Sequence, residues 1–146
     1  MRRTTLLLIA IIGLVFVMPA TAQVDVTWDG DTDTVWSNGD NWVGDAVPDS
    51  ADVAIFPATL TTNLPELDAA DQVYQLNFQK TDGGWTLDGA GVELTLRSRN
   101  NSEKTVFVDA ATSGTTTINP DLKFAGFAPY IFDLSSGGTV QFNGAT

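Results

Sequence analysis

Four aspartates in one short segment could bind a divalent cation. Residues 29–40 read DGDTDTVWSNGD, which puts Asp29, Asp31 and Asp33 at alternate positions and Asp40 at the twelfth. Carboxylates spaced in this way can converge on one calcium ion, because calcium prefers hard oxygen ligands. The match is partial, since the sixth position is threonine instead of glycine and no helix is expected to follow. The alternative is a solvated acidic turn, in which aspartates accept hydrogen bonds from nearby backbone N–H groups, and the sequence leaves both open.

Three tryptophans, Trp28, Trp36 and Trp42, lie in and around the same segment. Their flat faces, beside Asp and Asn side chains, would suit stacking against a sugar ring. The rings could instead pack together as a small core, because the end of a solenoid must be covered by a capping element. We favour this packing and keep glycan binding on these three residues as the alternative.

The residue types that are missing exclude several catalytic chemistries. The chain has no histidine, so it cannot form a Ser-His-Asp or Cys-His catalytic site or a His-ligated zinc or copper site. It has no cysteine, so its stability must come from packing and not from disulfides. Hydrolysis of glycosides by two carboxylates is chemically open, but no pair stands out among the 18 acidic residues. We predict that the protein is not an enzyme and that, calcium aside, it has no cofactor.

The first 22 residues have the pattern of a secretory signal peptide. Two arginines precede an apolar run over residues 6–18, and Ala20 and Ala22 then supply the small residues of a cleavage site. The run is shorter than the ~20 apolar residues of a transmembrane helix. We therefore expect cleavage after Ala22 and no membrane span afterwards. The predicted location is secreted, periplasmic or on the cell surface.

Removal of this segment leaves an acidic chain of 124 residues. It takes away two of the seven basic residues and none of the 18 acidic ones, so the net charge changes from −11 to −13. A field of this sign repels nucleic acids and anionic lipid surfaces, and we expect neither as a partner. The length that remains is sufficient for one domain with its own core.

Beyond residue 22, the pattern is that of short β-strands. Runs of β-branched, aromatic and other apolar residues alternate with Gly, Asp, Asn and Pro turns, and no segment has convincing helical periodicity. The expected strands cover residues 24–28, 53–56, 73–78, 85–87, 92–96, 105–108, 115–118, 130–134 and 139–142. Strands this short and this closely spaced predict an all-β fold, as a solenoid, a sandwich or a barrel.

The mature chain divides by character into two parts. Residues 23–70 are irregular and hold three of the four tryptophans, whereas residues 71–146 alternate strands and turns. In the second part, an apolar pair followed by a Gly or Asn turn recurs at Leu76/Phe78, Leu94/Leu96, Leu122/Phe124 and Val140/Phe142. The pairs are 18 to 28 residues apart, which suits one β-solenoid coil for each pair.

The mature chain also contains a series of short motifs. The first ones are Trp28-Asp29-Gly30, Trp36-Ser37, Asn41-Trp42, Pro48 and Asp52-Val53-Ala54-Ile55-Phe56. Later ones are Leu76-Asn77-Phe78, Trp85-Thr86-Leu87-Asp88-Gly89, Leu94-Thr95-Leu96, Thr115-Thr116-Thr117-Ile118-Asn119 and the segment from Gly138 to Gly144. Together they resemble the N-terminal region of bacterial proteins with autotransporter-associated β-strand repeats. The resemblance covers nearly all of residues 24–146.

The resemblance implies a right-handed parallel β-helix that serves as the stalk of a secreted or surface-displayed bacterial protein. Such proteins usually continue with further coils and an outer-membrane or sorting segment. This chain ends at Thr146 without such a segment, and that departure from the family pattern suggests a fragment, a truncated gene or a freely secreted remnant. An open coil edge near Phe142 would allow self-association or the addition of further coils.

We therefore predict an all-β chain with three parts: a signal peptide over residues 1–22, an irregular Trp-rich cap over residues 23–70, and β-solenoid coils over residues 71–146. The predicted function is that of a structural module without catalysis. The alternative is an antiparallel β-sandwich that binds carbohydrate through its tryptophans, with or without calcium. Parallel coils with buried tryptophans would distinguish the first prediction from the second.

Overall fold

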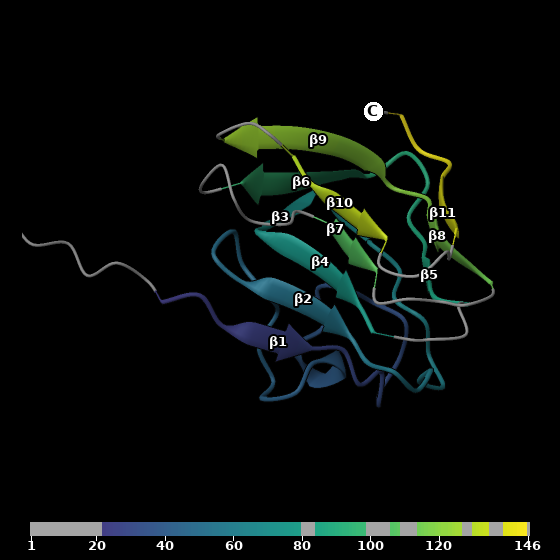
Figure 1. The fold of residues 1–146 in the computed structure, drawn as a ribbon. Helices are drawn as coiled ribbons and strands as arrows, with labels where there is room; N and C mark the ends of the chain where they lie inside the picture. Colours follow the sequence, from purple (N-terminus) through teal and green to yellow (C-terminus); the bar gives the residue numbers. More distant parts are fainter. Residues whose placement is uncertain are drawn as a thin grey trace, which may run out of the picture.

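The chain folds as a parallel β-solenoid of about four turns, shown in Figure 1. The structure, a computed structural model, describes residues 22–79, 84–98, 106–108, 114–126, 130–134 and 139–145. The predicted signal peptide therefore lies outside the described residues, except for Ala22. Within the described ranges, no helix has both the length and the apolar character that a membrane crossing requires.

Three parallel sheets form the sides of the solenoid. The first contains β1 (Asp25–Thr27), β2 (Val53–Phe56), β4 (Gln75–Phe78), β7 (Val106–Val108) and β10 (Phe132–Leu134), in this order. The second contains β5 (Thr86–Leu87), β8 (Thr115–Ile118) and β11 (Thr139–Phe142). The third contains β3 (Asp71–Val73), β6 (Glu93–Ser98) and β9 (Asp121–Gly126). A short 3-10 turn, η1 (Gly39–Asn41), lies between β1 and β2 along the chain.

Every pair of neighbouring strands that the structure describes is parallel. The predicted solenoid is confirmed, and the alternative of an antiparallel β-sandwich is wrong. Parallel neighbours need long connections, because the chain must return to the same end of the sheet before each new strand begins. In the first sheet, paired residues are 28, 22, 30 and 26 positions apart along the chain. These unequal coil lengths explain why the sequence shows no strict repeat.

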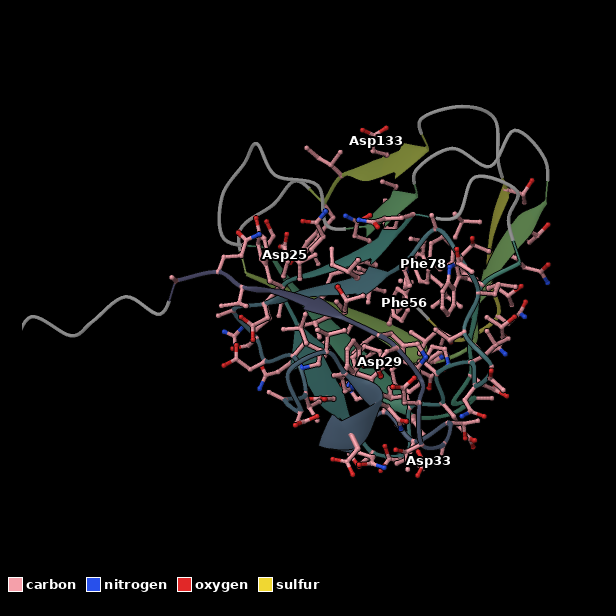
Figure 2. All side chains as sticks on the ribbon, turned by 90° about the horizontal axis from the view of Figure 1, so that it is seen from below. Asp25, Asp29, Asp33, Phe56, Phe78 and Asp133 are labelled. Atoms are coloured by element: carbon pink, nitrogen blue, oxygen red, sulfur yellow. The ribbon has the colours of Figure 1, made fainter. Side chains whose placement is uncertain are left out.

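Apolar side chains fill the space between the three sheets. Ala54 and Phe56 of β2 lie in register with Leu76 and Phe78 of β4, and all four are fully buried. The rings of Phe56 and Phe78, both labelled in Figure 2, stack with their centroids 4.4 Å apart and their planes at 13°. Each coil thereby buries the apolar layer of the coil before it, which is how neighbouring repeats stabilise one another in a solenoid.

The predicted cap over residues 23–70 is continuous with the solenoid. β1 and β2 are the first two strands of the first sheet, and β2 pairs directly with β4. The reason lies in the run Val53–Phe56, in which all four residues are buried, as in a strand that is covered on both faces. Val53 and Ile55 alternate with the residues that face the main core, and they pack with Tyr74 in a second, smaller cluster.

A polar ladder connects three successive coils. Asn119 Nδ2 donates to Asp88 Oδ1 (3.1 Å), and Asn143 Nδ2 donates to Asn119 Oδ1 (2.8 Å). The backbone follows the same order, since Asn119 N donates to Leu87 O (3.0 Å) and Asn143 N donates to Ile118 O (2.9 Å). Side chains that pair at equivalent positions help to fix the register of the stacked strands.

Gly89 allows two coils to approach closely. Its φ is +118°, and an added Cβ would lie 2.7 Å from the carbonyl oxygen of Leu67. Gly91 also has a positive φ (+78°), but a Cβ there would meet nothing within 4 Å.

We expect Gly89→Ala to lower the free energy of unfolding by about 3 kcal/mol and Gly91→Ala by only about 1 kcal/mol. Urea unfolding followed by circular dichroism measures both, and equal losses would contradict the close approach.

Candidate functional site

The three tryptophans of the predicted glycan site lie inside the protein. Trp42 is in the middle, with its ring centroid 5.0 Å from that of Trp28 and 4.8 Å from that of Trp36. Both pairs are edge-to-face, at 87° and 79°, which is a favoured arrangement of aromatic rings. Each of the three side chains is at most 1% exposed, and all belong to the main core. No face of these rings is therefore open to a sugar.

The indole N–H groups of these tryptophans all donate to protein atoms. Trp28 Nε1 donates to Asn63 O (2.9 Å), Trp36 Nε1 to Asp71 Oδ2 (2.8 Å), and Trp42 Nε1 to Trp36 O (2.9 Å). A buried indole N–H needs a partner, because leaving it unpaired would lose the hydrogen bond that it makes with water. The rings of these tryptophans are therefore buried, and their N–H groups are hydrogen-bonded, entirely within the protein.

Asn41, which belongs to the Asn41-Trp42 motif but is not among the predicted site residues, holds the acidic segment together. Its side chain is fully buried. Its Oδ1 accepts from the backbone N–H groups of Thr32 (3.1 Å) and Asp33 (2.9 Å), and its Nδ2 donates to Asp33 Oδ1 (2.6 Å) and Val35 O (2.9 Å). These four bonds use the full capacity of one amide side chain. The segment is therefore a turn folded around a buried amide.

Asp33 is the acidic partner of this amide. Besides Asn41, it accepts hydrogen bonds from Val35 N at Oδ1 (2.8 Å) and from Asn38 Nδ2 at Oδ2 (3.1 Å). The hydrogen bond from the Asn41 side chain, followed by that from the Val35 backbone, holds the pKa of Asp33 below its ordinary value of 3.8. The carboxylate is thus kept charged by the turn that it stabilises.

The four aspartates of the predicted calcium site are not brought together. Among the described residues, no group of three or more acidic, His or Cys side chains is placed to hold a metal ion. Asp33 uses both oxygens within the turn, whereas Asp31 and Asp40 are exposed. Asp29 Oδ1 is buried and has no hydrogen-bond partner among the residues that the structure describes. Calcium binding by this segment stays a prediction from the sequence.

Asp33 should make the stability of the cap depend on pH. Because its pKa is lower in the folded chain than its ordinary 3.8, its contribution is complete above that value and is lost as the pH falls through the folded pKa. We expect the wild type to be more stable than Asp33→Asn at neutral pH, and this difference to shrink below about pH 4. Thermal unfolding from neutral to strongly acidic pH measures it. A constant difference between the two Tm curves would contradict this role of the carboxylate.

Two further carboxylates, Asp68 and Asp71, accept hydrogen bonds from the acidic segment. Asp68 accepts from Ser37 N (3.0 Å) and from Ser37 Oγ (2.7 Å), while Asp71 accepts from the Trp36 indole. Partial burial raises the pKa of Asp68, but the hydrogen bonds from Ser37 outweigh it and hold that pKa below its ordinary value. Asp33, Asp68 and Asp71 therefore all accept hydrogen bonds from other residues of the fold.

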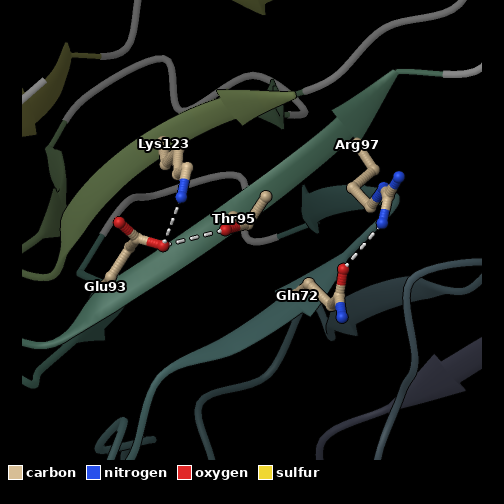
Figure 3. A network of polar contacts seen from close by, with 5 residues as sticks. All are labelled: Gln72, Glu93, Thr95, Arg97 and Lys123. Carbon is tan, nitrogen blue, oxygen red and sulfur yellow. Dashed lines mark hydrogen bonds and ion pairs between the residues drawn. The ribbon is translucent and has the colours of Figure 1, made fainter. Parts of the chain in front are cut away.

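The outer face of the third sheet carries a row of polar contacts, shown in Figure 3. Lys123 Nζ lies 3.2 Å from Glu93 Oε1, which also accepts from Thr95 Oγ1 (3.3 Å), and Arg97 Nη1 donates to Gln72 Oε1 (3.0 Å). The side chains of Lys123 and Glu93 are 59% and 47% exposed. Exposed pairs of this kind contribute at most about 1 kcal/mol. We therefore assign this row to the solvated surface and not to a binding site.

Comparison with known proteins adds no family. No protein-family model, curated protein or solved structure matches the chain. The resemblance to proteins with autotransporter-associated β-strand repeats therefore stays a prediction from the sequence.

Proposed function

We propose that this chain is a structural module of a secreted or surface-displayed bacterial protein, without a catalytic role. The observation that carries the proposal is that the fold itself uses the chemically capable groups of the cap. Trp28, Trp36 and Trp42 are buried and hydrogen-bonded within the protein. Asn41 and Asp33 likewise bind each other and the backbone around them. These side chains could otherwise bind a ligand, but here they form the core and the turn at the N-terminal end of the solenoid.

In this function the solenoid acts as a rod. Stacked coils share parallel sheets and a continuous apolar interior, so each coil stabilises its neighbours and the rod grows along one axis. Residues 41–43 lie against the end of β1, where Val43 N donates to Thr27 O (2.8 Å) and Asp29 N donates to Asn41 O (2.9 Å).

Two features of the sequence support export. The leader over residues 1–22 has the charge, apolar run and small residues of a signal peptide. The mature chain has a strong negative charge, which favours solubility outside the cell and disfavours nucleic acid as a partner. The resemblance to stalk-forming bacterial proteins points the same way, and the proposed location is secreted, periplasmic or on the cell surface.

Carbohydrate binding is the competing function, and it would need the faces of the tryptophans. Those faces lie in the main core, so binding would require the cap to open. This requirement is why we place carbohydrate binding second.

The mass of the protein that a bacterial host exports tests the proposal. We expect the full chain, expressed with its leader, to leave the cytoplasm as a protein that begins at Gln23. Ala22→Leu should keep the leader attached, because the cleavage site needs a small residue. Ala46→Leu, the same change at an exposed position of the cap, should be cleaved normally. A cytoplasmic wild-type chain that still begins at Met1 would contradict the proposal.

A further inference from the structure

The pair Asn38-Gly39, at the start of η1, can undergo a spontaneous chemical change. The side-chain amide of an asparagine that precedes glycine can lose ammonia, because the backbone nitrogen of a residue without a Cβ can approach the amide carbon closely. The chain contains two Asn-Gly pairs, Asn38-Gly39 in the cap and Asn143-Gly144 after β11. The surroundings of the two asparagines differ, and this difference decides what deamidation would do to the fold.

The fold requires both residues of the first pair. Asn38 is the N-cap residue of η1, and its Oδ1 accepts from Asp40 N (3.2 Å), as asparagine commonly does at this position. Gly39 lies against the backbone of residue 45, where an added Cβ would be 2.7 Å from Asp45 O. A larger residue after Asn38 would therefore clash. The reactive pair is thus a consequence of how the cap packs.

The folded acidic segment holds the reacting atoms apart. The ψ angle of Asn38 is 111°, which turns the Gly39 nitrogen away from the Asn38 side chain. The amide is also held at both ends, since its Nδ2 donates to Asp33 Oδ2 (3.1 Å) and its Oδ1 accepts from Asp40 N. Reaction needs the Gly39 nitrogen within about 3.5 Å of the amide carbon. The segment must therefore open locally before Asn38 can react.

Deamidation would place a second carboxylate against Asp33. The Asn38 amide now donates to Asp33 Oδ2, whereas Asp33 Oδ1 accepts from Val35 N and Asn41 Nδ2. Replacing the –NH2 group of Asn38 by a charged oxygen exchanges this hydrogen bond for repulsion between like charges at the same short distance.

The second Asn-Gly pair lacks this neighbour. Asn143 Nδ2 donates to Asn119 Oδ1 (2.8 Å), which belongs to an uncharged amide. A carboxylate at position 143 would lose this hydrogen bond without facing a carboxylate directly. Asn143 therefore serves as the matched control for Asn38.

We propose that Asn38 is a deamidation site that the folded acidic segment protects, and that its modification prevents the opened segment from closing correctly again. In the opened segment, the Gly39 nitrogen loses its proton to water and attacks Asn38 Cγ. The new C–N bond closes a five-membered succinimide, and the side-chain nitrogen leaves as ammonia. Water then opens the ring at either carbonyl, which gives aspartate or isoaspartate. The net reaction consumes one water and releases one ammonia.

Peptide mapping by mass spectrometry, during incubation of the chain as the host produces it, tests the protection. We expect Asn38 to deamidate at least about tenfold more slowly in the native wild type than in the same chain unfolded in urea. Asp33→Asn removes the acceptor of Asn38 Nδ2, so it should raise the native rate at Asn38 severalfold and leave the rate at Asn143 unchanged.

Two results would overturn this part of the proposal. Equal rates at Asn38 in the native and the unfolded wild type would show that the fold gives no protection. An Asn38 that stays intact in urea would show that it is not a deamidation site.

The effect of the product is tested with Asn38→Asp, which carries the same new charge. We expect its Tm to fall by several degrees, and that of Asn143→Asp by less. In the double variant Asp33→Asn/Asn38→Asp, the amide oxygen at position 33 can still accept from Val35 N and Asn41 Nδ2, and its –NH2 group can donate to the new carboxylate. This exchange should restore Tm above that of Asn38→Asp, as coupled neighbours do in a double-mutant cycle. A double variant no more stable than Asn38→Asp would contradict the repulsion.

Discussion

Replacing Asn41 with leucine is expected to lower the free energy of unfolding by about 3 kcal/mol, because the backbone groups around it lose their partners. Leucine has nearly the same size, so the change removes hydrogen bonds and little volume. The N–H groups of Thr32 and Asp33 and the carbonyl oxygen of Val35 would be left without the amide that they now bind. In a domain of this length the loss corresponds to a fall in Tm of about 10 °C.

Two further variants make this prediction specific. Asn143 is also an asparagine in the fold, but it is exposed, so Asn143→Leu should lower the stability by less than 1 kcal/mol. Asn41→Asp would set a second carboxylate against Asp33, where Asn41 Nδ2 now lies 2.6 Å from Oδ1. Its stability relative to the wild type should improve as the pH falls and one carboxyl is protonated. If Asn41→Leu and Asn143→Leu unfold at the same temperature, the buried amide does not organise the cap.

Trp42→Ala should have the largest effect of any single change in the cap, with a loss of about 4 kcal/mol. The side chain is fully buried and has edge-to-face contacts with Trp28 and Trp36 on either side. Its removal leaves a cavity and breaks the hydrogen bond to Trp36 O. Trp42→Phe keeps an aromatic ring but loses the N–H group, so we expect an intermediate loss of about 2 kcal/mol.

Guanidinium unfolding followed by far-ultraviolet circular dichroism measures this series without relying on tryptophan emission. The control is Val43→Ala, because Val43 is the next residue and is 60% exposed. We expect it to change the stability by no more than about 0.5 kcal/mol. A Trp42→Ala variant as stable as Val43→Ala would show that the tryptophans do not form a core.

Strand position could be predicted well where apolar alternation coincides with clear turn residues. The strands β2, β8 and β11 have the limits expected from sequence, over residues 53–56, 115–118 and 139–142. Each is a short run of β-branched and aromatic residues next to Pro, Gly or Asn, and such local signals need no tertiary information.

Two features of the strand arrangement were not predicted from the sequence. The run over residues 73–78 reads as one alternating strand, but Tyr74 is a corner, and β3 and β4 on either side of it belong to different sheets. β9 (Asp121–Gly126) was not among the expected strands, although its pair Leu122/Phe124 was noted and Lys123 lies between them at an exposed position. Its pairing with β6 along six residues depends on a partner far away in the sequence.

The recurrent apolar pairs all lie on strands of the solenoid, but only the 28-residue spacing from Leu94 to Leu122 is a coil length, because those two residues are register partners in the third sheet. Leu76/Phe78 belongs to the first sheet, Val140/Phe142 to the second, and the other two pairs to the third. An alternating strand looks the same in any sheet, so sequence alone cannot assign a pair to one side of the solenoid.

The candidate site shows the same limit of sequence reasoning. The types and spacing of the aspartates and tryptophans suggested ligand chemistry, yet the tryptophans are buried in the core and Asp33 is hydrogen-bonded within the turn. The key residue, Asn41, is of a type common in exposed turns, but in the tertiary fold its side chain is fully buried.

The accessibility of the tryptophans in the folded protein shows whether these rings form a core or a binding surface. We would measure the emission maximum and the quenching by acrylamide of the native chain, with and without a broad panel of glycans. Buried rings predict blue-shifted emission, weak quenching that rises only on unfolding, and no response to any glycan. Red-shifted emission, strong quenching in the native state and a saturable response to a glycan would contradict the account. That result would make the cap a carbohydrate-binding surface.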